Sequence, residues 1–236
     1  MSRTNEFGQP IGEPLEGWTA PALPPPSSLV GDHVTLEPLA VAHVDGLWTA
    51  LRAAPGSLWT YLAVGPFASR DALAGWIAAF AADEQIAPYA VVVDGRPVGL
   101  LSYLRMDPAM GCIEIGWIVY SPALQRTTAA TETIHLLLAH AFDLGYRRVE
   151  WKCDVLNAPS RAAADRYGFT YEGTFRHAAH YKDRNRDTAW YSITDREWPA
   201  LDRAFRDWLA PNNFDTDGAQ RRSLREHRAR LAAERS

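Results

Sequence analysis

The sequence predicts a mixed α/β fold built around one strand, helix and strand unit. Residues 112–120 are almost wholly apolar, which is typical of a strand buried on both faces. Apolar residues at 134, 137, 138 and 141 follow at helical spacing, and Leu144-Gly145 closes that helix. Residues 148–154 then alternate apolar and polar, as a strand does. This order predicts a right-handed crossover between two parallel strands.

Two helices and three strands are predicted before this unit. Residues 29–38 have the period of a first strand. Helices are predicted from the spacing of apolar residues at 41–53 and after Ser69, which is a suitable N-cap. Strands at 89–93 and 98–104 are joined by an Asp-Gly-Arg-Pro hairpin turn and lead into the apolar strand as an antiparallel meander.

Two helices and two strands are predicted after the unit. Asn157 and Pro159 begin a short helix that runs to Gly168. Strands are expected at 169–175 and 188–193, separated by a very polar loop, and a last helix at 198–208.

The chain divides into three parts on composition. Residues 1–28 are rich in proline and glycine and are expected to form an extended arm, either a poorly ordered leader or a strap across a dimer interface. Residues 29–209 form the main domain. Residues 210–236 end in a stretch with six arginines, which predicts a solvated basic tail, with a partner-binding helix as the alternative.

Composition restricts the class of protein. The 236 residues carry a net charge of −4, which argues against a nucleic-acid binder that works through overall charge. No apolar run reaches the length of a membrane span, and the first residues have no signal-peptide core. Cys112 and Cys153 are expected to pack inside the protein and not to form a redox or metal pair. We therefore expect a soluble cytoplasmic protein with no metal.

The first candidate binding site is the segment from Gln125 to Thr131, between the apolar strand and the helix. In such crossovers ligands bind at the carboxyl ends of the strands, where the helix N-terminus points. Free backbone N–H groups and a partial positive charge at that end suit a phosphate.

This segment resembles the central motif of the GCN5-related N-acetyltransferases (GNAT), and within them the RimJ/RimL-like branch. The family pattern [Gln/Arg]-x-x-Gly-x-[Gly/Ala] falls on residues 125–130, and Thr128 stands in the place of the central glycine. A glycine at that position lets the backbone approach a phosphate closely. A second signature matches downstream, an Asn-x-x-Ser helix start at Asn157 to Ser160 and a Gly-Phe close at 168–169. Together the motifs are specific, and the resemblance covers residues 29–205.

The resemblance implies a splayed mixed sheet flanked by helices, and acetyl-CoA as cosubstrate. Backbone amides of the loop would hold the pyrophosphate, and backbone groups of the preceding strand would pair with the pantetheine arm and the oxyanion. Asn157 would bind the CoA arm or order a water. The implied cofactor-binding residues are Trp117, Ile118, Val119, Gln125, Arg126, Thr127, Thr128, Ala129, Ala130, Thr131 and Asn157.

Two residues are candidates for catalysis. Glu114 is a lone acid in the apolar strand, where burial would raise its pKa toward neutrality and suit a general base, acting through a water. The alternative is a buried carboxylate that pairs with an arginine or a backbone donor. The resemblance implies Ser160 as the acid, because the tyrosine that many members use is Ala164 here and Tyr167 points elsewhere. Helix capping is the alternative for Ser160 and Asn157.

The acceptor side is less defined by the sequence. Residues 55–67 form an aromatic and glycine-rich loop that either covers the acceptor or packs ordinarily. Tyr103, Arg105 and the polar loop at 177–187 are expected to line the site, with His177 and His180 solvated and no metal bound. The acidic residues of that loop would attract a cationic amine, although its arginines offset them.

The leading hypothesis is an acetyl-CoA-dependent N-acetyltransferase that works by direct transfer in a ternary complex. Its acceptor would be a primary amine, either a protein N-terminus or a small molecule such as an antibiotic, polyamine or amino acid. An acyl-CoA-binding sensor without turnover is the alternative, and a longer or acidic acyl group such as succinyl is left open. A homodimer is also left open, and neither nucleic acid nor membrane is expected as a partner.

Overall fold

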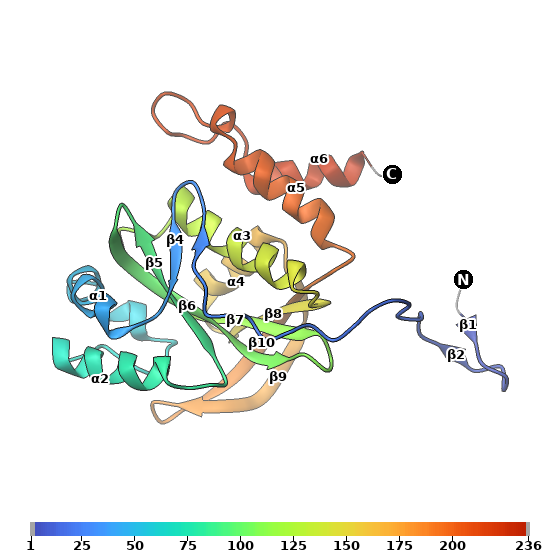
Figure 1. The fold of residues 1–236 in the computed structure, drawn as a ribbon, viewed down its shortest axis with the longest axis horizontal. Coiled ribbons are helices and arrows are strands. Elements are labelled where there is room, and N and C mark those ends of the chain that lie inside the picture. Colours follow the sequence, from blue (N-terminus) through green and yellow to red (C-terminus); the bar gives the residue numbers. More distant parts are fainter. Residues whose placement is uncertain (1–2, 235–236) are drawn as a thin grey trace.

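An eight-stranded mixed sheet forms the centre of the computed structural model, which describes residues 3–234 (Figure 1). Its spatial order is β3-β4-β5-β6-β7-β8-β10-β9, and β7 with β8 is the parallel pair of the described sheet. The bounds are β3 Leu29–Val30, β4 Thr35–Pro38, β5 Ala87–Val93, β6 Arg96–Asp107, β7 Cys112–Tyr120, β8 Arg148–Asp154, β9 Thr170–Tyr181 and β10 Arg184–Thr194. The predicted mixed α/β class with a splayed sheet is confirmed.

The splay lies between β7 and β8. They pair from Cys112 opposite Arg148 to Glu114 opposite Glu150, and beyond that point no further pairing joins them in the described sheet. β7 also bulges against β6 around Trp117, whose φ is 52°. Bulges re-aim backbone groups and are frequent beside functional sites. The carboxyl half of β7 therefore offers backbone groups to a ligand on the side that β8 has left.

Helices cover both faces of the sheet and enclose two apolar clusters. The larger cluster lies under α3 and α4, with α5 and α6 outside them, and the smaller lies under α1 and α2 (Figure 1). Within residues 3–234, no helix combines the length and apolar character needed to cross a bilayer. The bounds are α1 Val44–Leu51, α2 Arg70–Ala81, α3 Thr128–Asp143, α4 Ala158–Tyr167, α5 Trp198–Leu209 and α6 Leu224–Ala233, with short 3-10 turns η1 Val41–His43, η2 Gly56–Trp59 and η3 Pro211–Asn213.

The N-terminal arm touches the body through Trp18. The indole Nε1 donates to the Gly145 carbonyl at 3.1 Å, and the guanidinium of Arg147 lies 5.5 Å from the centre of the ring. The hairpin of β1 Arg3–Thr4 and β2 Pro10–Ile11 stands away from the sheet (Figure 1). A dimer strap stays a prediction.

The expectation of a solvated C-terminal tail is wrong for residues 224–233. These residues form α6, whose N-terminus is closed by a capping box between Ser223 and Glu226. Leu224 and Leu231, seven residues apart, are buried on one face in the larger cluster beside α5. The tripartite division of the chain stays a prediction, and residues 1–2 and 235–236 of its arm and tail lie outside the described residues.

The predicted first strand at 29–38 is a short hairpin, with β3 and β4 paired across a turn. The turn is held from a distance, because the buried carboxylate of Glu132 on α3 accepts hydrogen bonds from the amides of Asp32 at 2.9 Å and His33 at 2.7 Å. A contact across about a hundred residues cannot be read from local pattern.

The predicted polar loop at 177–187 is mostly strand. β9 continues to Tyr181 and β10 begins at Arg184, with Lys182 and Asp183 at the turn in left-handed conformation. The residues of this stretch are polar because β9 is an edge strand with an exposed surface. The hairpin extends the sheet far enough to reach the loop after η2.

Candidate active site

A cavity of about 560 Å³ opens where β7 and β8 diverge. Its wall comes from six parts of the fold: β6, β7, β8, the β9–β10 pair, the start of α4, and the loop after η2. Glu114, Ser160, Asn157, Trp117 and Ile118, all predicted site residues, line it together. The fold thus brings both predicted catalytic residues to one space.

Glu114 and Ser160 reach this cavity from opposite faces of the sheet. The Glu114 carboxylate contacts Lys152 of β8, whereas the Ser160 hydroxyl accepts a hydrogen bond from the indole of Trp151. Lys152 and Trp151 are successive residues of one strand, so their side chains point to opposite faces. Because the strands diverge here, the cavity connects the two faces.

Glu114 is buried and faces two cations. Only 4% of the residue is exposed, Lys152 Nζ lies 2.7 Å from Oε2 as an ion pair, and Arg105 Nε lies 3.6 Å from the same atom. Burial raises the pKa of Glu114, and the charges of Lys152 and then Arg105 partly oppose that rise. The carboxyl thus combines a raised pKa, which suits a general base, with the ion-pair contact that the alternative interpretation expected.

Glu114 also belongs to a chain of alternating charges on one face of the sheet. Arg105 Nε is 3.9 Å from Glu150, and Arg148 Nε bonds the same carboxylate at 2.9 Å. Arg148 then contacts Glu172 on β9, which raises the pKa of Arg148 and lowers that of Glu172. In order, the chain is Glu172, Arg148, Glu150, Arg105, Glu114 and Lys152.

Trp190 on β10 supports both cations that face Glu114. Lys152 Nζ lies 4.6 Å from the ring centre and the Arg105 guanidinium 5.3 Å, so each makes a cation–π contact. Sequence reasoning assigned neither Lys152 nor Trp190 to the site. Alternation placed Lys152 on one face of its strand, but only the pairing of β10 with β8 sets Trp190 opposite it.

Asn157 and Ser160 also take part in capping α4, which was the alternative to a role in the reaction. Asn157 Oδ1 accepts from the Ser160 amide at 3.2 Å, which closes the N-terminus of α4. Ser160 Oγ accepts from Trp151 Nε1 at 3.1 Å, and its own hydrogen can be donated elsewhere. Burial raises the pKa of the neighbouring Cys153 thiol, and the Ser160 hydroxyl partly offsets that rise.

The predicted phosphate loop leads into α3, but the helix begins at Thr128, so residues 128–131 are its first turn and not part of a loop before it. Thr127 is the N-cap, and its Oγ1 accepts from the Ala130 amide at 3.1 Å. Gln125 Nε2 donates to the Tyr120 carbonyl at 2.9 Å, which fixes the start of the loop, and Arg126 has a φ of 64°. Within residues 3–234, the amides of Arg126, Thr128 and Ala129 have no hydrogen-bond partner. Such amides at a helix N-terminus fit a phosphate group.

The remaining predicted cofactor residues are more enclosed. Ala129, Ala130 and Thr131 are buried, and Thr131 Oγ1 accepts from Arg166 at 3.1 Å. Val119 is buried in the smaller apolar cluster. None of residues 125–131 lines the cavity. The loop and the cavity are therefore two separate parts of the candidate site.

The loop after η2 covers one side of the cavity with Tyr61, Leu62 and Ala63. The β9–β10 turn holds it, because Lys182 Nζ donates to the carbonyls of Trp59 and Gly65, both at 2.8 Å. Arg184 Nη2 donates to the Thr60 carbonyl at 2.7 Å, and Tyr61 donates to the Leu156 carbonyl at 2.9 Å. Both alternatives for this loop are seen: Tyr61, Leu62 and Ala63 line the cavity, whereas Trp59 and Phe67 pack in the smaller apolar cluster.

Some of the residues predicted to line the acceptor side do line the cavity, and others do not. Arg105 lines the cavity, as do Ala178, Ala179 and Arg186 from the predicted loop. Tyr103 does not, because it is fully buried and donates its hydroxyl to the Leu137 carbonyl inside the larger cluster. His177 and His180 are exposed. Across residues 3–234, no group of three or more His, Cys, Asp or Glu side chains is placed to hold a metal.

Comparison with known proteins defines the class. Residues 33–170 match the acetyltransferase (GNAT) domain family. A GCN5-related N-acetyltransferase from Brucella melitensis is 42% identical, with a TM-score of 0.88 over 91% of this chain and all of that one. A probable acetyltransferase from Chromobacterium violaceum is 43% identical, with a TM-score of 0.77 over 81% of this chain and 98% of that one.

A curated relative indicates which branch of the acetyltransferase family this chain resembles. The Bacillus subtilis protein named "Putative ribosomal N-acetyltransferase YdaF" is 29% identical over 109 residues, which are 46% of this chain and 59% of that protein. The chain belongs to the GNAT acetyltransferase family, and its resemblance to the RimJ/RimL-like branch is confirmed.

Proposed function

We propose that this protein is an acetyl-CoA-dependent N-acetyltransferase of the cytoplasm that acetylates a primary amine directly in a ternary complex. The observation that carries the proposal is the meeting of Glu114 and Ser160, from opposite faces of the sheet, in one cavity at the open edge of β7. A base on one face and a hydroxyl donor on the other suit a reaction between an acceptor and a thioester that enter from different sides.

The phosphate end of acetyl-CoA would be held by the start of α3. The unpartnered amides of Arg126, Thr128 and Ala129 suit its pyrophosphate, and the Arg126 side chain adds a positive charge. The unpaired edge of β7 at Trp117 and Ile118 would hydrogen-bond the pantetheine arm as an added strand does. The thioester would then lie in the cavity between the diverging strands.

The reaction would proceed by attack of the neutral amine on the thioester carbonyl. Glu114 takes the amine proton, directly or through a water, as the C–N bond forms. The carbonyl electrons move to oxygen, which a backbone N–H near Ile118 stabilises. When the C–S bond breaks, the electron pair leaves with sulfur, and the Ser160 hydroxyl donates a hydrogen bond to it. The amide nitrogen then carries the acetyl group.

The test is calorimetric titration with acetyl-CoA and with CoA, followed by measurement of CoA release with a panel of amines and peptides. Binding in the micromolar range together with amine-dependent CoA release supports the proposal. The absence of binding at millimolar ligand would contradict it, because the loop at the start of α3 would then not hold the cosubstrate.

An acyl-CoA-binding module without turnover is the second candidate. Two observations favour it: Lys152 occupies the Glu114 carboxylate at 2.7 Å, and Thr128 replaces the glycine of the family loop. In that case acetyl-CoA binds, no acceptor accelerates CoA release, and Glu114→Gln leaves both observations unchanged.

The acceptor is proposed to be a protein N-terminus or a small amine. The name of the Bacillus subtilis relative supports the first, although the match covers 59% of that protein. The covering loop restricts the space above the cavity, which suits an extended N-terminal segment or a compact amine better than a folded surface.

A further inference from the structure

The cavity carries an excess of positive charge in a chain whose net charge is −4. Four cationic side chains line it, against two carboxylates. The cations are Arg105, Lys152, Arg176 and Arg186, and the carboxylates are Glu114 and Asp154. Charge of this sign concentrates anions in a hollow with low-dielectric walls.

The two carboxylates do not neutralise all of these cations. Glu114 is taken by Lys152 and Arg105, and Asp154 accepts from the Tyr181 hydroxyl at 2.7 Å and the Leu156 amide at 2.9 Å. In residues 3–234, neither Arg176 nor Arg186 has a carboxylate within ion-pair distance. Arg186 Nε donates to Thr188 Oγ1 at 3.1 Å, and Arg176 interacts with Asp187 from beyond ion-pair distance. Among the described residues, the terminal nitrogens of both guanidinium groups therefore remain available to a ligand.

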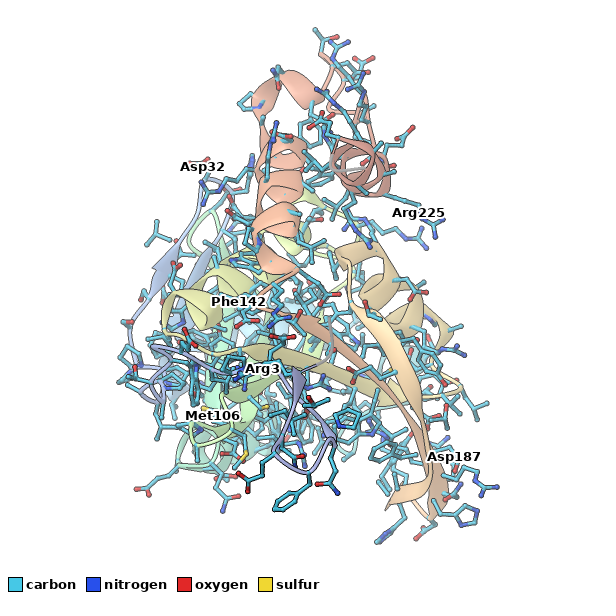
Figure 2. The ribbon with its side chains drawn as sticks, turned by 90° about the vertical axis from the view of Figure 1, so that its right-hand side faces the viewer. Arg3, Asp32, Met106, Phe142, Asp187 and Arg225 are labelled. Carbon is cyan, nitrogen blue, oxygen red and sulfur yellow. The ribbon has the colours of Figure 1, made fainter. Side chains whose placement is uncertain are left out.

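The backbone around these arginines is bent. Arg186 opposes Ala179, whereas Thr188 opposes Phe175, so β9 has extra residues at this place, and His177 among them has a φ of 52°. Asp187 holds the bulge by accepting from the His177 amide at 2.8 Å, and it lies near the lower end of the β9–β10 pair in Figure 2. Arg105 also has a positive φ, 46°. Left-handed conformation in residues other than glycine is costly and gathers at functional sites.

We infer that the acceptor carries an anionic group, a carboxylate or a phosphate, close to the amine that is acetylated, and that Arg176 and Arg186 bind it. This rests on the proposed function and narrows its acceptor class. A guanidinium binds a carboxylate or phosphate through two parallel N–H donors, which fixes orientation as well as charge. Polyamines and polycationic antibiotics are then poor acceptors.

The phosphates of acetyl-CoA do not account for these arginines. Residues 125–131, which present free amides at the start of α3, are outside the cavity wall. The arginines instead share the wall with Glu114 and with the covering residues Tyr61 and Leu62. Arg186, Thr188 and Trp190 alternate along β10, so Arg186 lies on the face of Trp190, whose ring contacts Lys152 and Arg105 beside Glu114. That is the acceptor face of the proposed reaction, and Arg176 lines the same cavity at the bulge of β9.

The experiment compares matched acceptors that differ in one charge. The peptide amides Ser-Asp-Ala-Tyr and Ser-Asn-Ala-Tyr test an acidic N-terminus, and serine against serinamide tests a small amino acid. A steady-state assay of CoA release gives the KM and kcat of each. We expect a KM about ten-fold lower for the anionic member of at least one pair, the size of one charge-assisted hydrogen bond.

Arg176→Gln and Arg186→Gln test the residues. Each should raise the KM of the anionic acceptor about ten-fold and leave the neutral acceptor and the KM of acetyl-CoA unchanged. Arg196→Gln, an exposed arginine outside this cavity, is the matched control and should change none of these. Circular dichroism checks that each variant keeps its fold.

A binding measurement separates this inference from the proposed function. The acetylated forms of the two peptides are titrated calorimetrically into the protein with CoA present. If the anionic product binds more tightly and the arginine variants abolish the difference, the inference holds even where no turnover is found. Equal binding and equal KM within each pair would overturn it while leaving acetyl transfer intact. A rise in the KM of acetyl-CoA in the arginine variants would overturn it as well, because the cations would then serve the cosubstrate.

Discussion

The loop at the start of α3 and the cavity between β7 and β8 are built in different ways. The loop uses seven consecutive residues, and its hydrogen bonds join near neighbours such as Thr127 with Ala130 and Gln125 with Tyr120, except for the bond between Thr131 and Arg166. The cavity draws on residues from Tyr61 to Trp190, and its ion pairs join separate strands. One part is local in sequence, and the other exists only when the sheet has formed.

This difference separates two tasks in the proposed reaction. A helix N-terminus presents backbone amides, which almost any side chain can accompany, so we expect the loop to tolerate Thr128 in place of glycine. The cavity depends on charge, where one cation at 2.7 Å from Glu114 changes its pKa. We therefore expect loop variants to change the affinity for acetyl-CoA, and cavity variants to change turnover.

The largest effect is expected for Glu114→Gln. The amide keeps the shape of the carboxyl but accepts no proton, so kcat should fall by about 10² to 10³, the usual contribution of a general base. The Kd of acetyl-CoA from calorimetry should stay within about two-fold. In the wild type, kcat/KM should fall as pH drops through the raised pKa of Glu114. The variant should lack this acid limb of the pH–rate profile.

Glu84→Gln is the control, because Glu84 is exposed and does not line the cavity, and it should match the wild type. A large loss of acetyl-CoA affinity in Glu114→Gln would show that this carboxyl supports the cosubstrate and would contradict its role as the base.

Local pattern was enough for most of the fold and for the loop. The bounds of β7 and β8, the Ser69 cap of α2 and the Asn157 cap of α4 all follow from the identity of neighbouring residues. Glu114 was found because it is a single acid in an apolar strand. These features share one property, which is that the residues responsible lie within a few positions of each other.

Features that need distant strands were missed. Lys152 and Trp190 meet because β10 pairs with β8. Arg105 was predicted to line the site, but its contacts with both Glu114 and Glu150 depend on β6 lying beside β7. The burial of α6 was missed for the same reason, since two leucines in an arginine-rich stretch are not sufficient to show a helix packed on α5. Register between strands is a tertiary property that alternation alone does not fix.

Ser160→Ala is expected to lower kcat about ten-fold, because the leaving sulfur loses one hydrogen-bond donor. The helix should remain, since Asn157 still caps it through the backbone amide at position 160. The indole of Trp151 loses its acceptor, which should cost about 1 kcal/mol in the free energy of unfolding.

Stopped-flow measurement of CoA release and urea unfolding give the two quantities for Ser160→Ala. Ser160→Thr, which keeps the hydroxyl, is the matched control. If kcat is unchanged in the alanine variant while stability falls, Ser160 is a structural residue and leaves the mechanism.

Lys152→Met should lower kcat/KM at neutral pH by about three- to ten-fold, a smaller effect than that of Glu114→Gln. It should also change the pH dependence of kcat/KM. The Lys152 charge opposes the rise that burial causes in the Glu114 pKa, so its removal raises that pKa further. The acid limb of the pH–rate profile should then move to higher pH. Lys152→Arg keeps the charge and should keep the limb in place.

Stability gives an independent check on Lys152→Met. A carboxyl with a raised pKa in the folded state contributes stability below its unfolded pKa, and that contribution is lost as pH rises through the folded value. Without Lys152 the loss is greater, so the gap in unfolding free energy between variant and wild type should widen as pH rises from below the unfolded pKa of the carboxyl to neutral pH. A constant gap would show that Lys152 does not act on Glu114.

The smallest effect is expected for Thr128→Gly, which restores the residue of the family pattern. Thr128 is the first residue of α3, and glycine there lowers helix stability slightly while it lets the backbone approach a phosphate more closely. These effects oppose each other, so the Kd of acetyl-CoA should change by at most about three-fold, with kcat unaltered.

Thr127→Ala, which removes the N-cap hydrogen bond to Ala130, should weaken binding more, by about five-fold. If Thr128→Gly instead lowers the Kd of acetyl-CoA ten-fold or more, the threonine weakens cosubstrate binding by the loop. That result would favour the acyl-CoA-binding module without turnover over the enzyme.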